Sequence, residues 1–511
     1  MAAQRNYDDS GARTGRSHHA RARTTLAFIA IAGGFMSTPG LANDASAGVA
    51  SRTTEESAGV APHIENGATS EPLSLRKQYA TTRSVAAAPH RDLPTYVHTY
   101  SLGERGDNWF DFGLEQRTRF EIRDDFYAKS LASDDRFLMR TRGYLGVRSA
   151  LDPLRFGVEF QDSRRLGGEL NIEDTGDINE NELLQLFAEL YFADAVAPGH
   201  PVSIRFGRMS YDTIDRRLVA RNRFRNTTNA FDGLRVRIGD DMTPWEIEAF
   251  AYQPVERFIR SFDHGDDERW FYGLTGAWRG WSPWVTLEPY YFVLDEDRKA
   301  YSAIDREIHT LGLHGFGLIG DSGFDYDFNV AYQFGNVTRG KHRAFATHAE
   351  LGYTFDTEWT PRAAFMFDYA SGDENPNDGV NERFDRLFGA AHNFYGHSDN
   401  VILSNLIQAA LHLSAKPSKK LKLNAFYRNF WLASDRDAFV SARISDPLGQ
   451  SGDWVGHEID LRAQYALSGE VGLDLGFSHF MPGAFTSHAG GASVDDSDFF
   501  YVQITITPKF E

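Results

Sequence analysis

An alternation of apolar and charged residues begins at Trp109 and limits the possible fold more than any other feature of the sequence. Between residues 109 and 123 the even positions are mostly apolar, and they are Phe110, Phe112, Leu114, Gln116, Thr118, Phe120 and Ile122. The odd positions are mostly charged, and they are Asp111, Gly113, Glu115, Arg117, Arg119, Glu121 and Arg123. A period of two residues is typical of a β-strand. A soluble sandwich buries the apolar face of such a strand, whereas a membrane barrel presents that face to lipid and its polar face to the lumen.

The same alternation recurs along the chain and predicts about 18 strands. They lie near residues 108–123, 136–149, 154–164, 183–192, 202–208, 231–238, 245–252, 270–278, 284–294, 308–316, 324–334, 343–355, 360–370, 403–414, 420–431, 456–467, 471–480 and 498–507. Most are long enough to cross a bilayer at a tilt, which takes about 9 to 11 residues, and only those near 202 and 231 look short. No fixed repeat of the kind found in propellers and solenoids is present. The prediction is an all-β fold, a single antiparallel up-and-down transmembrane β-barrel.

The connections between these segments alternate in length. The short ones carry turn residues, as in Ala197-Pro198-Gly199 and Lys416-Pro417-Ser418. The long, polar ones are 165–181, 209–230, 253–269, 295–307, 371–402, 432–455 and 481–497. Short periplasmic turns alternating with long outer loops are typical of outer-membrane barrels, and an even strand count places both termini in the periplasm.

The N-terminal region has the features of an export signal followed by a leader. Arginines precede the apolar stretch Thr24 to Met36, and Gly40 and Ala42 precede a plausible cleavage site. Residues 43–105 are rich in Ala, Ser, Thr and Gly, as in flexible segments. We therefore expect a signal peptide at 1–42, a flexible periplasmic leader at 43–105 and the barrel at 106–511, in the outer membrane of a Gram-negative-type bacterium.

Composition and motifs exclude several classes of function. The formal net charge of −18, without a basic patch, argues against nucleic acid as a partner. The sequence has no nucleophile elbow, no HExxH zinc motif and no Gly-rich phosphate loop, so we expect no enzyme and no cofactor. The acidic run Ser371 to Asp378 lacks the ligand spacing of a calcium loop, so no metal site is predicted.

Arginine dominates the predicted lumen face of the first six strands. These residues are Arg117, Arg119, Arg123, Arg136, Arg140, Arg142, Arg148, Arg155, Arg205, Arg235 and Arg237. Carboxylates such as Glu115, Glu121 and Glu189 share that face. Two interpretations remain open: the charges pair across neighbouring strands and stiffen a wet wall, or the arginines form an anion-selective constriction.

Four sequence blocks resemble the alginate-export family of outer-membrane proteins. They are Arg205-Phe206-Gly207-Arg208 with the later Phe231-Asp232-Gly233-Leu234-Arg235; Phe367 to Asp373 with Arg383 to Gly389; Phe430 to Asp435; and Gly456 to Leu461 with Phe477 to Gly483. The resemblance covers about residues 105 to 511. It implies an 18-stranded monomeric barrel that exports a polyanionic exopolysaccharide through an arginine-lined pore.

The resemblance and the alternation together predict which arginines line the pore and contact the carboxylates of the substrate. These arginines are Arg119, Arg140, Arg142, Arg205, Arg235 and Arg383. The loop 371–402, which carries Arg383, is expected to gate the outer mouth or to fold inward.

The leading functional prediction is export of an acidic, alginate-like exopolysaccharide, with outer-membrane lipid and a periplasmic secretion scaffold as partners. One alternative is an uptake porin for small anions or sugar acids. A second is a non-conducting surface or adhesion barrel.

Overall fold

The computed structural model describes residues 93–102, 108–126, 132–149, 153–168, 173–240, 243–282, 284–297, 305–338, 340–489 and 495–510. All of them belong to one compact unit that spans residues 59–511. The predicted signal peptide at 1–42 and most of the predicted leader lie outside the described residues. No described helix is both long and apolar enough to cross a membrane.

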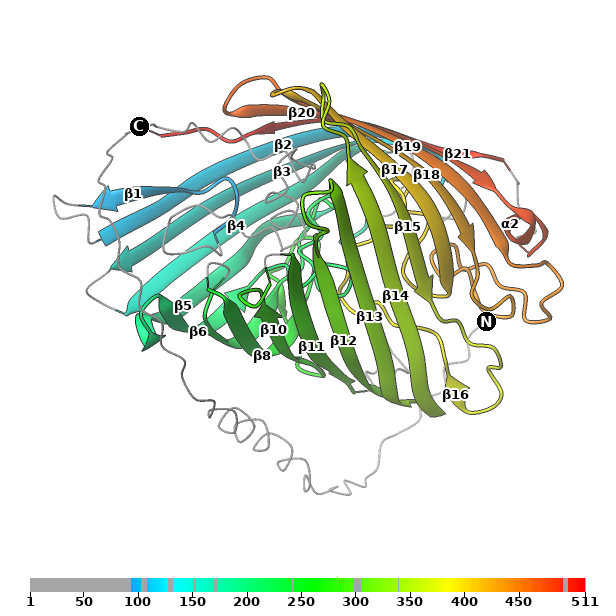
Figure 1. Cartoon of the computed structure of the whole chain (residues 1–511), viewed down its shortest axis with the longest axis horizontal. Coiled ribbons are helices and arrows are strands. Elements are labelled where there is room, and N and C mark those ends of the chain that lie inside the picture. The colour runs from blue at the N-terminus through cyan, green and yellow to red at the C-terminus, as the bar shows by residue number, and fades with distance from the viewer. Residues whose placement is uncertain are drawn as a thin grey trace, which may run out of the picture. The chain divides into compact units, whose positions relative to one another are not determined.

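Eighteen long strands form the wall within the described part of the chain (Figure 1). They are β2 (Asn108–Phe126), β3 (Ala132–Ser149), β4 (Leu154–Gly167), β5 (Asn179–Ala197), β6 (His200–Met209), β7 (Phe231–Ile238), β8 (Trp245–Glu256), β10 (Arg269–Trp278), β11 (Val285–Glu296), β12 (Arg306–Leu318), β13 (Phe324–Val337), β14 (Gly340–Thr354), β15 (Arg362–Ala370), β17 (Leu406–Ser418), β18 (Leu421–Trp431), β19 (Trp454–Ala466), β20 (Val471–Pro482) and β21 (Ser497–Ile506). Each overlaps one of the predicted segments, so the predicted fold and strand count are confirmed. Of the two short segments, β6 extends at both ends and β7 does not.

The strands close into a ring. Each long strand pairs antiparallel with its neighbour in sequence, and β2 pairs with both β3 and β21. Closure places Arg119 beside Gln503, near the other end of the sequence. A closed ring leaves no strand edge for another chain to extend.

The structure also contains a few short elements outside the long wall strands. They are β1 (His98–Leu102), β9 (His264–Gly265), β16 (Val380–Asn381) and the helix α2 (Ala484–Ala489). β1 pairs with the first residues of β2, and β16 pairs with β14 in parallel.

The distribution of side chains is the reverse of that in a soluble protein, because many large apolar side chains are exposed on the outside and many charged ones are buried inside. On β4 exposed and buried residues alternate, and Phe156 and Phe160 are more than half exposed. Arg119, Arg148 and Arg428 are among the largest fully buried side chains. Lipid replaces water around the outer face, so apolar residues are favoured there and charged residues are confined to the interior.

The segment before β1 enters the barrel. Tyr96 is buried, and its hydroxyl donates to Glu159 Oε1 at 2.6 Å. A Cβ at Gly113 would lie 2.3 Å from the Tyr96 carbonyl oxygen, so the close approach of this segment to β2 requires glycine there. Part of the region predicted as leader therefore contacts the lumen wall directly.

Candidate functional site

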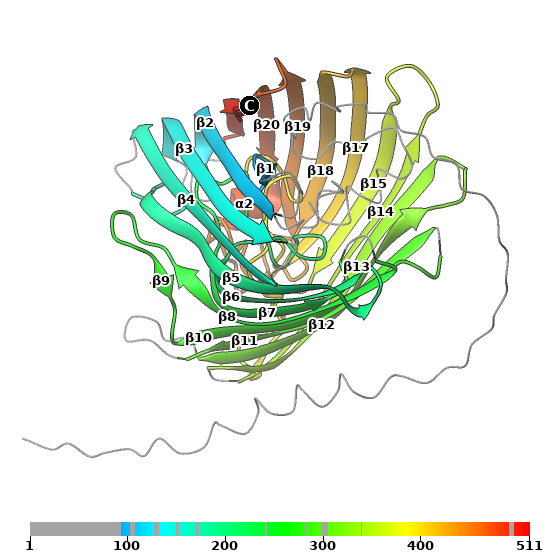
Figure 2. The ribbon, with the colours of Figure 1, turned by 90° about the vertical axis from the view of Figure 1, so that its left-hand side faces the viewer.

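Two of the long outer loops fold into the lumen and pack against each other. Figure 2 shows loop segments inside the ring of strands. Residues 210–230, between β6 and β7, contact residues 371–405, between β15 and β17, through a bridge of Val219 with Phe388. The Phe388 N–H donates to the Leu218 carbonyl at 2.9 Å, and the Ala220 N–H donates to the Phe388 carbonyl at 3.2 Å. We call these two segments the lumen loops. The second contains the loop 371–402, which was expected either to gate the outer mouth or to fold inward, and it folds inward.

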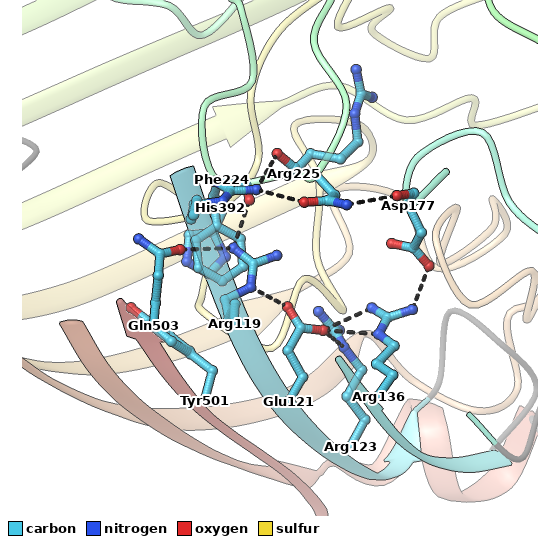
Figure 3. Close-up of polar contacts among 12 residues, drawn as sticks. Arg119, Glu121, Arg123, Arg136, Asp177, Phe224, Arg225, His392, Tyr501 and Gln503 are labelled. Atoms are coloured by element: carbon cyan, nitrogen blue, oxygen red, sulfur yellow. Dashed lines mark hydrogen bonds and ion pairs between the residues drawn. The ribbon is translucent and has the colours of Figure 1, made fainter. Parts of the chain in front are cut away.

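Arginines of the wall hold the first lumen loop by its backbone. Arg119 Nη1 donates to the Phe224 carbonyl at 2.7 Å (Figure 3). Arg117 and Arg140 both donate to the Arg223 carbonyl, at 2.8 and 3.1 Å. Hydrogen bonds from charged donors are stronger than neutral ones, so these guanidinium groups fix the loop against β2 and β3.

One buried carboxylate joins three of the wall arginines. Glu121, on β2, lies 2.7 Å from Arg119 Nε, 2.8 Å from Arg136 Nη2 and 3.2 Å from Arg123 Nε. Arg136 also donates to Asp177, at the end of the loop between β4 and β5 (Figure 3). Glu121 thus joins three guanidinium groups, and Asp177 and Asp399 lie beside two of them, Arg136 and Arg123.

A cavity of about 480 Å³ lies among the lumen loops and the wall. Its carboxylates are Asp174, Asp177, Asp212, Glu350 and Asp399. Its arginines are more numerous, and they are Arg119, Arg123, Arg136, Arg216, Arg223, Arg225, Arg386 and Arg462. The cavity surface therefore offers more guanidinium groups than carboxylates to an anion, although Glu121 and Asp474 pair with four of these arginines from behind the surface.

Three arginines gather on one side of this region with little compensation. Arg225 Nη2 and Arg257 Nη1 both donate to Asn229 Oδ1, at 2.5 and 2.9 Å. Burial and the neighbouring Arg257 and Arg386 hold the pKa of Arg225 well below its usual range. Burial also lowers the pKa of Arg386. Among the described residues, no carboxylate forms an ion pair with these three guanidinium groups, although Asp174 and Asp177 act on Arg225 from a greater distance.

The predicted site residues on the first strands lie together. Arg119 lines the cavity, whereas Arg140 and Arg142 lie beside Glu115, at 2.8 and 3.7 Å. Arg142 also donates to Gln161 at 2.9 Å and to Thr228 of the first lumen loop. These arginines both face the lumen and position the loop that narrows it.

The other predicted site residues lie apart from that group, each beside a carboxylate. The pairs are Arg205 with Glu189 at 3.1 Å, Arg235 with Glu248 at 3.8 Å, and Arg383 with Asp437 at 2.7 Å. The pair Arg383–Asp437 links the second lumen loop to the outer loop 432–453. Arg205 and Arg235, which lie on strands, therefore fit the first of the two interpretations left open for the lumen arginines, in which charges pair across neighbouring strands.

The arginines that most enrich the cavity come from the lumen loops, which carry no alternation. Arg216, Arg223 and Arg225 belong to the segment RRLVARNRFRN at 216–226, and Arg386 belongs to the second loop. The density of arginine in 216–226 was the available sequence signal. Alternation alone directs attention to strands and so misses these residues.

Comparison with known proteins assigns this arginine-lined barrel to a family. Residues 108–500 match the alginate export family. The chain belongs to the alginate export family. This family and the barrel fold are those of outer-membrane channels, not of enzymes, which places the protein in the Gram-negative outer membrane.

Solved outer-membrane porins share the fold of this alginate export family member. OccK11 (OpdR) of Pseudomonas aeruginosa matches with a TM-score of 0.51 and 15% identity, over 78% of this chain and 96% of that chain. OprD of the same organism matches with a TM-score of 0.52 and 12% identity, over 78% and 94%. OccAB1 of Acinetobacter baumannii matches with a TM-score of 0.53 and 11% identity, over 79% and 97%. No curated protein matches the chain in sequence.

Proposed function

We propose that this outer-membrane channel passes an anionic substrate along the arginine-lined cavity, and that the substrate is an acidic exopolysaccharide of the alginate type moving outward. The observation that carries the proposal is the larger number of arginines than carboxylates that line the cavity, among them Arg225 and Arg386, which form no ion pair within the described residues. Membership of the alginate export family supports the choice of a polyuronate.

The chemistry of the cavity suits carboxylates that arrive in series. A guanidinium group binds a carboxylate through two parallel N–H donors. Arginines that already share acceptors hold an incoming carboxylate only moderately, because each must divide its donors. Conduction needs sites that are favourable enough to enter and weak enough to leave.

The six predicted contact residues have two different roles in this proposal. They are Arg119, Arg140, Arg142, Arg205, Arg235 and Arg383. Arg119 lies on the cavity and is proposed to contact the substrate directly. The other five are proposed to act on passing carboxylates from positions where each also has an acidic neighbour.

Planar-bilayer recording of the purified barrel tests the proposal. We expect a preference for anions and a reversible block of the current by uronate oligomers. Arg225→Ala with Arg386→Ala should weaken the block most, and Arg140→Ala with Arg142→Ala should weaken it less. Arg260→Ala is the matched control, because Arg260 pairs with Glu173 on exposed loops and does not line the cavity. A preference for cations without a block by uronates would refute the anion pathway.

The same preparation separates the remaining alternatives. A barrel that passes no current would support the non-conducting surface barrel, for which the packed lumen loops are the relevant observation. Direction is tested in cells: deletion of an exporter should trap acidic polysaccharide in the periplasm, whereas deletion of an uptake porin should abolish entry of labelled uronate monomers.

A further inference from the structure

A row of acidic and imidazole side chains crosses the inner wall of the barrel. It runs over five successive strands, with Glu288 on β11, His314 on β12, Asp327 on β13, His348 on β14 and Asp368 on β15. All five side chains are buried.

Both imidazoles are oriented in the same way. The Nδ1 atoms of His314 and His348 lie 2.8 Å from Glu288 Oε2 and Asp368 Oδ1. Their Nε2 atoms face the two oxygens of Asp327, at 3.1 Å for His314 and 3.8 Å for His348. In metal sites a carboxylate that accepts the Nδ1–H of a histidine fixes the ring and leaves Nε2 to bind the ion.

The first lumen loop brings a further carboxylate to the same place. One ligand atom each of Asp215, His314 and Asp327 lies within 4.8 Å of the others, and all three residues are buried. Asp215 Oδ2 accepts hydrogen bonds from Asn329 at 2.8 Å and from Arg217 at 3.1 Å. In a tetrahedral zinc site, with metal–ligand bonds of about 2.0–2.1 Å, ligand atoms lie about 3.3 Å apart, which is close to the 3.1 Å between His314 and Asp327.

Two atoms in this cluster lack a hydrogen-bond partner. They are Asp327 Oδ1 and His348 Nε2, on side chains that are each 2% exposed. Buried polar atoms are almost always satisfied, and leaving one unsatisfied is costly. A cation bound by the Asp327 carboxylate would satisfy its Oδ1 atom.

We propose that Asp215, His314 and Asp327 bind a divalent transition metal of the zinc type. Mixed imidazole and carboxylate ligands suit such ions, whereas Ca²⁺ and Mg²⁺ take oxygen ligands. Glu288 and Asp368 orient the two imidazoles. The bound ion would tie the first lumen loop, through Asp215, to the wall at β12 and β13.

The site was not visible in the sequence because its ligands come from a loop and two strands that pair only in the fold. The competing explanation is that a doubly protonated His314 bridges Glu288 and Asp327 without any metal. Metal binding distinguishes the two.

Cobalt titration of the chelator-treated, detergent-solubilised full barrel is the direct test. We expect one Co²⁺ per barrel, d–d absorption bands of low-symmetry coordination, displacement of Co²⁺ by Zn²⁺, and no competition from Mg²⁺. His314→Gln should abolish the bands. Glu288→Gln, which alters only the group that orients His314, should weaken affinity by about 10- to 100-fold.

The matched control is His342→Gln. His342 is also a buried, inward histidine on β14, but its Nε2 faces Gln333 Oε1 at 3.2 Å and it lies outside the cluster. The His342→Gln barrel should bind Co²⁺ as the wild type does. Heat-modifiable migration in gels should show that every variant is folded. Absence of stoichiometric Co²⁺ from the wild type, or an unchanged spectrum in folded His314→Gln, would overturn the proposal in favour of the protonated bridge.

Discussion

Replacing Glu121 by glutamine should destabilise the barrel strongly, because this one buried carboxylate serves three arginines. The side chain is fully enclosed and contacts Arg119, Arg123 and Arg136 at 2.7 to 3.2 Å. Glutamine keeps the size of glutamate and one acceptor oxygen, but it removes the charge and directs an N–H₂ group toward other donors. The substitution therefore leaves three guanidinium groups around a neutral side chain.

The structure sets the size of the effect. Removing one partner of a buried ion pair costs about 3–5 kcal/mol. Arg119 retains the Phe224 carbonyl as an acceptor and Arg136 retains Asp177, so the result should fall near the lower value, about 3 kcal/mol. With an m-value of about 3 kcal/mol per molar urea, the unfolding midpoint should fall by about 1 M.

Urea unfolding in lipid vesicles, followed by tryptophan fluorescence, measures this change. The control is Glu173→Gln, which removes the carboxylate of an exposed pair with Arg260 and should leave the midpoint unchanged. A shift in Glu121→Gln no larger than in that control would refute the view that the three arginines depend on Glu121.

Two further predictions concern the lumen loops. Burial lowers the pKa of His397 to about 3, below the 6.5 of an unfolded histidine, so its contribution to stability is present above pH 6.5 and is lost as the pH falls toward 3. The unfolding midpoint of His397→Gln should therefore fall less between pH 7 and pH 4 than that of the wild type, and an identical fall in both would contradict this. Arg383→Ala should remove the side-chain link between the second lumen loop and Asp437, leaving only the hydrogen bond from the Asp373 N–H, and should increase current fluctuations in single-channel records. An unchanged noise spectrum would show that the Arg383 contact does not restrain the loop.

The strands were predictable because their signal is local. Between Asp111 and Arg123 of β2, buried residues alternate with more exposed ones, and Arg117 and Arg119 are buried as the alternation requires. The environment on the two sides of the wall imposes the pattern, so a single segment of sequence reveals it.

The interior was not predictable in the same way. Arg117 holds the loop through the Arg223 carbonyl, 106 residues away, and any residue at position 223 offers that oxygen. His314 and Asp327 meet because β12 and β13 pair in one particular register, which alternation alone does not specify. Contacts to backbone atoms and contacts that depend on register leave no motif in the sequence, so the cavity became visible only in three dimensions.

The pairing of β2 with β21 also has a consequence for biogenesis. Arg119 and Gln503, which meet in this seam, are 384 residues apart in the chain. Every other strand of the wall can find its neighbour as the polypeptide arrives, but this seam joins the earliest strand to the latest, and such distant pairings form slowly. Until Ser497–Ile506 is delivered, β2 and β20 present open edges of the kind that recruit other chains. A polypeptide cut short before residue 497 should therefore remain an unclosed sheet, subject to aggregation and to periplasmic proteolysis.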